Sequence, residues 1–329
     1  MNPRAILFLA LVAWPGSGSA ETPSSPPLVL EMKIPLGEVS GRIDHLGIDV
    51  PRRRLFVAEL GNNSLGVVDL AAGKTMRTIA GMGEPQGVAY VPFADSVYVA
   101  NGGDGSVRVL RGEDLVPVGR IELGNDADNV RVDTQRQRVL VGYGKGALAV
   151  IDPAARAKVA DIRLRAHPEG FQIDEMGTKV FVNVPDARAV NVADLAQGAV
   201  RSLPMRNAGS NFPMAVDGQG HRILVIFRSP PTLMALSSED ERVAATTETC
   251  GDADDVFVDT KRHRVYVSCG EGVVDAFEQA DGDYRRLARV PTVSAARTSL
   301  FVPELDRLFV AVRARSGEPA AVWVFRPVP

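Results

Sequence analysis

The segment DADDVFVDTKRHRVYVSCGEGVVDAF, residues 252–277, shows the unit from which this chain is built. It contains two short apolar runs joined by a polar turn, and a third run follows a loop that contains glycine. Variants of this segment recur along the whole chain. When the copies are aligned on Val265, the first residue of the second run, the same position is occupied by Leu55, Val97, Val139, Val180, Ile223 and Leu308.

These anchor positions are separated by 42, 42, 41, 43, 42 and 43 residues. A period of about 40 residues built from several short strands is typical of a β-propeller, in which each repeat forms one four-stranded blade. Seven copies close one ring. The sequence therefore predicts an all-β, seven-bladed β-propeller as a single domain over residues 28–329, although a chain of 329 residues would ordinarily suggest two domains.

The last repeat, which begins at Ala295, provides only three strand-like runs before the chain stops at Pro329. Its outer strand has to come from elsewhere. Residues 28–36, LVLEMKIPL, resemble the outer strands of other repeats, such as residues 118–123. We expect this N-terminal strand to complete the last blade, because a closed ring has no unpaired strand at the seam.

Residues 1–20 resemble a secretory signal peptide. Arg4 provides the positive start, residues 5–14 form an apolar core, and small residues precede a cut after Ala20. The apolar core is too short to cross roughly 30 Å of hydrocarbon as a helix, so we expect no membrane span. Residues 21–27 form a Pro/Ser-rich tether that we expect to be disordered. The sequence thus predicts an exported protein, periplasmic or secreted; the alternative is an uncleaved hydrophobic N-terminus.

The composition limits the classes of partner. The chain has 37 Lys and Arg against 40 Asp and Glu, a net charge of −3 at pH 7. Nucleic-acid binding draws on clustered Lys and Arg, so the balance argues against a nucleic-acid partner. We expect a small molecule or a protein as the partner, and a monomeric chain.

The turn between the first and second strands of a blade carries a repeated charge pattern. An Asp precedes the anchor by six residues in five repeats, and a basic residue precedes it by one in six. Asp accepts backbone N–H bonds in such turns, and the basic residue can pair with it. We interpret both as scaffold residues; they are Asp49, Asp133, Asp174, Asp217 and Asp259, with Arg54, Arg138, Lys179, Arg222, Arg264 and Arg307.

The loops that lead into the innermost strands have a different composition, and we call them the mouth loops. They are RIDH (42–45), EPQG (84–87), DADN (126–129), HPEG (167–170), SNFP (210–213), DADD (252–255) and AART (295–298). Because every innermost strand lines the channel, these loops converge at its mouth. The predicted ligand-binding residues are Arg42, Asp44, Glu84, Asp126, Asp128, Asn129, Glu169, Asn211, Asp252, Asp254, Asp255 and Arg297.

The acids of the mouth loops allow two interpretations. Asp, Asn, Gly and Pro also form loops, so the acids can be a solvated polar rim. Carboxylates in a narrow concave mouth, however, raise one another's pKa or need a cation, which favours a binding site. A divalent cation is one candidate cofactor, with oxygen ligands from Asp44, Asp126, Asp128 and Asp252, but their spacing matches no recognised metal motif and the cofactor is undetermined.

His45 and His167 are the candidate catalytic residues, because imidazoles at a channel mouth can act as general acid or base. They would also suit a transition metal. The alternative for each is a hydrogen-bonded loop residue. The sequence contains no Gly-x-Ser-x-Gly elbow, His-Glu-x-x-His motif or Walker loop.

Cys250 and Cys269 both approach the mouth in the predicted blades. In an oxidising compartment a disulfide between them is the first interpretation. A free reactive thiol and a metal-binding pair are the alternatives.

One resemblance covers nearly all of the chain after residue 20. The unit Ile-Asp-x-x-x-x-Arg-Leu-Phe-Val-Ala-x-x-x-x-Asn-Ser-x-x-Val-Val-Asp-Leu at residues 48–70, and its relative with Tyr-Val-Ala-Asn at residues 88–110, resemble YVTN-repeat β-propellers of the YncE type. The resemblance implies an exported propeller that binds a ligand or a protein. A more distant likeness to lactonase-type and streptogramin-lyase-type propellers implies chemistry at the mouth, although none of their catalytic motifs matches here.

The sequence therefore predicts an exported propeller that binds a small molecule, a cation or a protein at an acidic channel mouth. The alternative is a metal-assisted hydrolase or lyase that acts on a lactone or related ester. A structural subunit of a periplasmic assembly is a third class, which predicts an exposed apolar patch on a blade flank.

Overall fold

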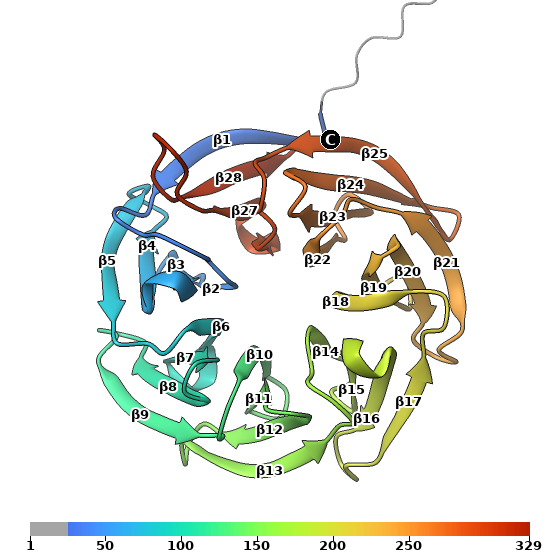
Figure 1. Ribbon diagram of the computed structural model, residues 1–329, viewed down its shortest axis with the longest axis horizontal. Coiled ribbons are helices and arrows are strands. Elements are labelled where there is room, and N and C mark those ends of the chain that lie inside the picture. The colour runs from blue at the N-terminus through green and yellow to red at the C-terminus, as the bar shows by residue number, and fades with distance from the viewer. Residues whose placement is uncertain (1–25) are drawn as a thin grey trace, which may run out of the picture.

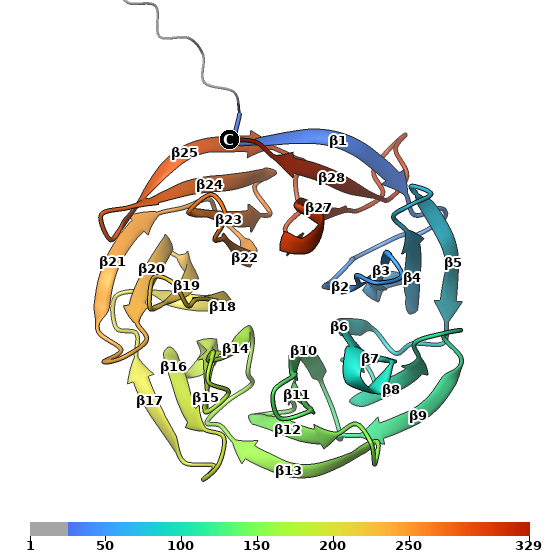
Figure 2. The same ribbon diagram turned by 180° about the vertical axis from the view of Figure 1, so that it is seen from behind.

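A computed structural model describes residues 26–329 of the chain. The predicted signal peptide, residues 1–20, and most of the predicted tether, residues 21–27, lie outside the described residues. The described part contains seven four-stranded antiparallel sheets arranged as blades around a central axis (Figure 1), and the view from behind shows the same ring (Figure 2). The predicted seven-bladed propeller is confirmed.

The first six blades are each built from four strands that follow one another in the chain, from the channel outward. Blades one to three comprise β2 (Leu46–Asp49), β3 (Arg54–Glu59), β4 (Ser64–Asp69) and β5 (Lys74–Ala80); β6 (Pro85–Val91), β7 (Ser96–Asn101), β8 (Ser106–Arg111) and β9 (Pro117–Glu122); and β10 (Ala127–Asp133), β11 (Arg138–Tyr143), β12 (Ala147–Asp152) and β13 (Ala157–Arg163). Blades four to six comprise β14 (Phe171–Ile173), β15 (Lys179–Val184), β16 (Ala189–Asp194) and β17 (Val200–Pro204); β18 (Gly209–Asp217), β19 (Arg222–Ser229), β20 (Pro231–Ser237) and β21 (Val243–Glu248); and β22 (Ala253–Asp259), β23 (Arg264–Cys269), β24 (Val273–Ala280) and β25 (Asp283–Pro291).

The seventh blade closes the ring with strands from both ends of the described chain. It comprises β26 (Ser299–Val302), β27 (Arg307–Val312), β28 (Ala321–Pro327) and, on its outside, β1 (Leu28–Pro35). β1 pairs antiparallel with β28 along its length, from Leu28 opposite Pro327 to Pro35 opposite Ala321. The predicted closure by an N-terminal strand is confirmed.

The hydrophobic core lies between neighbouring blades. Because side chains alternate across a strand, each middle strand sends apolar residues to both faces of its blade. Between blades five and six, for example, Leu224 and Ile226 of β19 share one buried cluster with Val265 and Val267 of β23. The described part also has the 3₁₀ helices η1 (Leu60–Asn62), η2 (Pro92–Ala94), η3 (Pro185–Ala187) and η4 (Pro303–Leu305), and none of its helices has the length and hydropathy of a membrane span.

The turns between the first and second strands form one end of the ring, which we call the turn face. The predicted pairs form between Asp49 and Arg54, 2.6 Å apart, and between Asp133 and Arg138, 2.9 Å apart. The Asp174 carboxylate instead accepts the backbone N–H groups of Thr178 and Lys179. These acids therefore stabilise the turns, as predicted.

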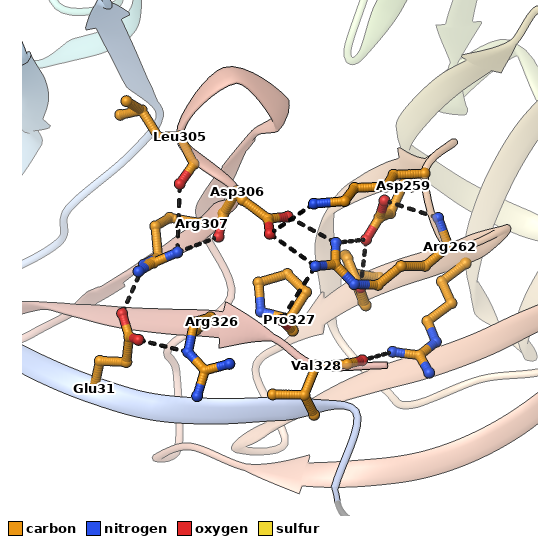
Figure 3. A network of polar contacts seen from close by, with 12 residues as sticks. Glu31, Asp259, Arg262, Leu305, Asp306, Arg307, Arg326, Pro327 and Val328 are labelled. Carbon is orange, nitrogen blue, oxygen red and sulfur yellow. Dashed lines mark hydrogen bonds and ion pairs between the residues drawn. The ribbon is translucent and has the colours of Figure 1, made fainter.

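Other contacts of the turn face join one blade to the next. Arg262 contacts Asp259 of its own blade at 3.0 Å and Asp306 of the seventh blade at 2.7 Å (Figure 3). On the same seam, Glu31 of β1 contacts Arg307 of β27 and Arg326 of β28 at 2.6 and 2.7 Å. These ion pairs hold the closing strand and the last two blades together.

Candidate functional site

The mouth loops surround a hollow at the opposite end of the channel, with an empty volume of about 760 Å³ that includes its opening to solvent. The third residue of every loop faces this mouth hollow. These residues are Asp44, Gln86, Asp128, Glu169, Phe212, Asp254 and Arg297, and the lining is completed by Arg42, His45, Asp126, His167 and Arg228. Each blade thus contributes one side chain to the ring around the hollow.

Backbone geometry explains why the third position faces inward. The first residue has a left-handed backbone, with φ between 46° and 65°, in five loops: Glu84, Asp126, Ser210, Asp252 and Ala295. The second residue is buried in all seven loops and anchors each of them: Ile43, Pro85, Ala127, Pro168, Asn211, Ala253 and Ala296. The buried anchor at the second position is thus common to all seven loops whose third side chain faces the hollow, and five of them also have the left-handed turn.

The fourth position begins the descent into the channel, where neighbouring blades approach closely. A Cβ atom on Gly87 would collide with the carbonyl oxygen of Asp128, and one on Gly170 with that of Phe212. Only glycine fits at such an approach. The mouth loop of the next blade can therefore approach the backbone closely at Gly87 and at Gly170.

A second, narrower hollow lies beside the mouth hollow, among residues of the inner strands, and we call it the throat. Its cavity volume is about 30 Å³, against about 350 Å³ in the mouth hollow. His45, Glu169, Phe212 and Asp254 line both hollows, so the two adjoin. Deeper residues of the inner strands complete the throat, among them Asn129, Arg131, Gln172, Met214, Asp255 and Phe257.

Arginines neutralise much of the acid at the mouth. Arg297 contacts Asp252 at 2.6 Å and Asp254 at 2.9 Å. Arg228 contacts Asp254 at 2.5 Å, and its guanidinium group lies 3.8 Å from the centre of the Phe212 ring. Such a cation–π contact adds to the ion pair. On the other side of the ring, Arg42 contacts Asp44 at 2.7 Å, so the mouth has mixed charge and is not simply acidic.

The two histidines each lie between carboxylates. His45 Nε2 is 3.7 Å from Asp44, and its Nδ1 is 3.6 Å from Asp255. Burial lowers the pKa of His45, but the negative charges of Asp255, Asp44 and Asp128 outweigh it and raise the pKa to about 10. His45 is therefore protonated at neutral pH.

His167 has a similar environment. Its Nδ1 lies 2.6 Å from the Gly144 carbonyl oxygen and 3.4 Å from Asp126, and its Nε2 lies 3.8 Å from Asp128. Burial lowers its pKa, whereas Asp128, the Gly144 carbonyl and Asp126 raise it, with a result of about 9. A protonated imidazole cannot accept a proton, so neither histidine is set up as a general base.

Burial has the opposite effect on the acids. It raises the pKa of Glu169 to about 8, with a further contribution from Asp128 and opposition from His167. It also raises the pKa of Asp44 to about 6, against the lowering effect of His45 and Arg42, and it raises the pKa of Asp254. Glu169 thus carries a proton at neutral pH, and the described residues form no ion pair or hydrogen bond with its carboxyl group.

Three predicted ligand-binding residues do not line either hollow. Glu84 is exposed on the rim, and Gln86 of the same loop faces the hollow in its place. Asn211 is fully buried, where its amide donates to Asn183 Oδ1 and to the Ala189 carbonyl oxygen. Asp252 lies outside the lining of both hollows and forms an ion pair with Arg297. The sequence shows which loops converge, but not which position in each loop turns inward.

The sequence analysis missed arginines that come from strands. Arg228 lies near the end of β19, and Arg131 lies on β10. A signal for the first was present: five residues after the anchor, only two repeats carry Arg, Arg228 and Arg313, where the others have Leu60, Gly102, Gly144, Pro185 and Gly270. A signal for Arg131 was present as well: it lies eight residues before its anchor, where the other repeats have the uncharged residues Gly47, Ala89, Gln172, Ala215, Phe257 and Leu300.

The structure joins Cys250 and Cys269 by a disulfide, with sulfur atoms 1.96 Å apart and both residues fully buried. Cys269 ends β23, and Cys250 follows β21 just before the DADD loop. The disulfide therefore ties blade six to the segment that positions Asp252 and Asp254. The free-thiol and metal-pair alternatives do not apply to this arrangement.

Over residues 26–329, no three His, Cys, Asp or Glu side chains are grouped so that they could hold a metal ion. Two of the four carboxylates considered as cation ligands, Asp44 and Asp252, contact arginines instead. The guanidinium groups occupy the places at which a cation would approach these oxygens.

Comparison with known proteins gives the fold and no family. No protein-family model and no curated protein sequence matches this chain. Solved structures do match. They are similar to this chain in fold, a seven-bladed β-propeller.

Three of these structures illustrate the likeness. A chain of hydrazine synthase from Kuenenia stuttgartiensis matches with a TM-score of 0.74 at 18% identity, over 88% of this chain and 95% of that one. A chain of the mitotic checkpoint complex matches with a TM-score of 0.78 at 13% identity, over 98% and 99%. The WD40 repeats of RRP9 match with a TM-score of 0.76 at 11% identity, over 89% and 99%. At such low identity the likeness extends to the fold alone.

Proposed function

We propose that this protein binds a small polar molecule in the mouth hollow. The observation that carries the proposal is that all seven mouth loops direct their third residue into one hollow, where the Glu169 carboxyl group has no partner among the described residues. Concave sites with a few convergent polar groups are the usual places for small ligands. The sequence likeness to YVTN-repeat propellers of the YncE type supports a binding role.

Mixed charge defines what the site can recognise. Arg42, Arg228 and Arg297 supply N–H donors, Glu169 supplies an O–H donor, and Asp128 supplies acceptor oxygens. A ligand with both donors and acceptors can pair with these groups. The mouth suits such a molecule better than a bare cation, because the acids already contact arginine or histidine.

The proposal is tested by filling the hollow. A library of small polar compounds is screened at pH 7 for compounds that raise the melting temperature of the protein. The variant Gln86→Trp places an indole in the mouth, where the wild-type amide contacts only Asp126 at 3.3 Å. We expect this variant to abolish the shift caused by each compound that binds the mouth.

The matched control is Gln197→Trp, which places the same indole on an exposed turn between β16 and β17. It should keep the full ligand-induced shift. Shifts that survive Gln86→Trp for every active compound would contradict the proposal.

The hydrolase or lyase alternative is less well supported. It assigns His45 or His167 as a base, and both imidazoles are held protonated by neighbouring carboxylates. The remaining alternative, a subunit of a larger assembly, predicts a continuous apolar patch. Of the exposed large apolar side chains among the described residues, Met76, Val159 and Val243 lie on the outer strands of different blades. Leu30 and Met32 lie together on β1, and Val116 and Met176 lie outside the strands.

We also propose that the protein is exported to the periplasm or secreted. The N-terminal sequence and the disulfide between Cys250 and Cys269 support this, because disulfides persist in oxidising compartments. The mass of the protein recovered from its native compartment should correspond to a chain that begins at Glu21. A full-length mass would contradict the proposal.

A further inference from the structure

The throat contains hydrogen-bond donors that no acceptor of the described chain uses. Asn129 and Arg131 lie two residues apart on β10, so both side chains face the channel. Within residues 26–329, the only hydrogen bond of the Arg131 guanidinium is to the neighbouring Val130 carbonyl oxygen, at 2.9 Å. Its other contact is with the ring of Phe171, whose centre lies 5.5 Å away. Most of its N–H groups are therefore free to point into the throat.

Arg131 differs from the other arginines of the two hollows. Arg42, Arg228 and Arg297 each lie within 3 Å of a carboxylate. No carboxylate of the described residues forms an ion pair with Arg131. Removing a cation from bulk water without a partner at ion-pair distance is costly. Burial accordingly lowers the pKa of Arg131, although the charges of Asp255 and Asp128 oppose part of this lowering. An anion supplied by a ligand would offset this cost.

Two more groups of the throat can add to such a site. The Asn129 side chain is 2% exposed, its Oδ1 has no partner, and its amide makes no hydrogen bond to the described residues. Glu169 reaches the throat from the neighbouring blade and carries a proton at neutral pH. A guanidinium group, an amide and a carboxylic acid can all donate hydrogen bonds to one oxyanion.

The size and the walls of the throat narrow the ligand class. The throat is much the tighter of the two hollows: its cavity volume is about 30 Å³, against about 350 Å³ in the mouth, so it has room for a group about as large as a carboxylate. Phe212, which lines both hollows, provides apolar wall beside the donors. A carboxylate attached to a short hydrocarbon body fits this combination, because the planar guanidinium fork matches carboxylate geometry and the body can contact Phe212 from the mouth.

We propose that the throat binds the carboxylate group of a small organic acid that enters through the mouth, and that Arg131 is the residue that receives it. This inference rests on the proposed function and names the ligand class. The remainder of the acid lies in the mouth hollow among the third-position side chains.

The test compares carboxylates with their neutral amides. Propionate and benzoate, and propionamide and benzamide as controls, are titrated into the wild-type protein by calorimetry at pH 7 in a buffer without carboxylates. We expect the acids to bind and the amides not to bind. Arg131→Gln should weaken the binding of the acids by at least about tenfold, because it removes the charge and the fork together. Arg131→Lys should keep part of the affinity, because it keeps the charge alone.

The control variant is Arg136→Gln, which removes an arginine from the turn face, where Arg136 donates to the Met176 carbonyl oxygen. Its affinity for both acids should equal that of the wild type. The melting temperature of each variant without ligand shows whether the fold is retained. Arg131→Lys keeps the test valid if Arg131→Gln fails to fold.

Three results would overturn the inference: no heat from either acid at about 20 mM, equal binding of acids and amides, or wild-type affinity in Arg131→Gln. Inorganic phosphate is a separate arm, and a preference for phosphate over both acids would replace the carboxylate class. If compounds from the screen fail to bind Gln86→Trp but bind Arg131→Gln like the wild type, the proposed function stands and this inference is wrong. Acids that need Arg131 but still bind Gln86→Trp would contradict binding through the mouth.

Discussion

At the turn face, hydrogen bonds from Arg262 and Lys261 lower the pKa of Asp306 to about 2, whereas at the mouth burial raises the pKa of Glu169 to about 8. Both ends of the ring use acids and arginines. At the turn face the Asp carboxylates are paired with nearby arginines and backbone N–H groups: Asp49 accepts from Arg54 and from the backbone N–H of Arg52, and Arg262 contacts both Asp259 and Asp306. At the mouth, acids from several blades converge on three arginines and on one another.

This difference separates stability from recognition. Carboxylates that are paired with arginines or backbone N–H groups fix turns and join blades, so their loss should weaken the fold at every pH above their pKa. Carboxyl groups crowded into a hollow destabilise the fold when they ionise, and such groups persist where they have a function. The predictions below test this contrast.

The largest expected effect is at the turn face. Asp49→Asn removes the charge that faces Arg54, which is 7% exposed and lies 2.6 Å from the carboxylate. Leaving a buried charge without its partner should lower the free energy of unfolding by about 3 kcal/mol, measured by urea denaturation at pH 7. The control is Asp281→Asn, at an exposed turn position with φ 53° that Asn also adopts. An effect no larger than that of the control would contradict the proposed difference between the turn face and the mouth.

Glu169→Gln should raise the free energy of unfolding, whereas Asp49→Asn should lower it. Because the pKa of Glu169 is about 8 in the folded protein and near 4.5 in the unfolded chain, the wild type loses stability as the pH rises from 4.5 to 8. The neutral, isosteric amide avoids this loss. The variant should exceed the wild type by roughly 2 kcal/mol at pH 9, with the difference growing between pH 4.5 and 8. A difference that does not change with pH would contradict the raised pKa.

His45→Gln tests the paired cation of the mouth. The pKa of His45 is raised from 6.5 to about 10, so its stabilising contribution is complete below pH 6.5 and disappears as the pH approaches 10. The variant should be destabilised by roughly 1–2 kcal/mol at pH 6 and much less at pH 10. His263→Gln, in an exposed turn, gives the effect of losing an imidazole outside the mouth. Equal destabilisation at both pH values would argue against the ion pairs of His45.

The smallest effect is expected from Asp306→Asn, which removes the contacts to Arg262 and Lys261 at 2.7 and 3.2 Å. Because these groups are partly solvated, the loss should be about 1 kcal/mol at pH 7. The pKa of Asp306 is lowered from 3.8 to about 2, so the stabilisation is present above pH 3.8 and fades as the pH falls to 2. Urea denaturation at pH 7 and at pH 2.5 measures both values. A loss that persists at pH 2.5 would have another cause.

The fold could be predicted from the sequence because its period is explicit. The anchor positions Leu55 to Leu308 gave the seven blades, and the missing strand of the last repeat identified β1 as its closure. The mouth could be predicted in part, since four-residue loops before inner strands must converge. The orientation of the side chains could not be predicted: Glu84 lies on the rim and Gln86 lines the hollow, whereas Asp126, at the same loop position as Glu84 and also with a left-handed backbone, does line it.

The charge states of the mouth residues also could not be predicted from the sequence. The pKa of Glu169 depends on burial and on Asp128, and the partners of Asp254 come from β19 and from the last blade. Arg131 is the one charged residue eight positions before an anchor, but the sequence could not show that it has no ion-pair partner. Ion pairs between blades form only when the ring closes, so the sequence of a single repeat does not reveal them.

The most direct test of the central claim is hydrogen–deuterium exchange with and without the strongest compound from the thermal-shift screen. The account predicts slower exchange in peptides that cover the mouth loops 42–45, 126–129 and 252–255, and unchanged exchange in the turns at residues 49–54 and 259–264. Slower exchange at the turn face with unchanged mouth loops would contradict the assignment of the mouth as the binding site.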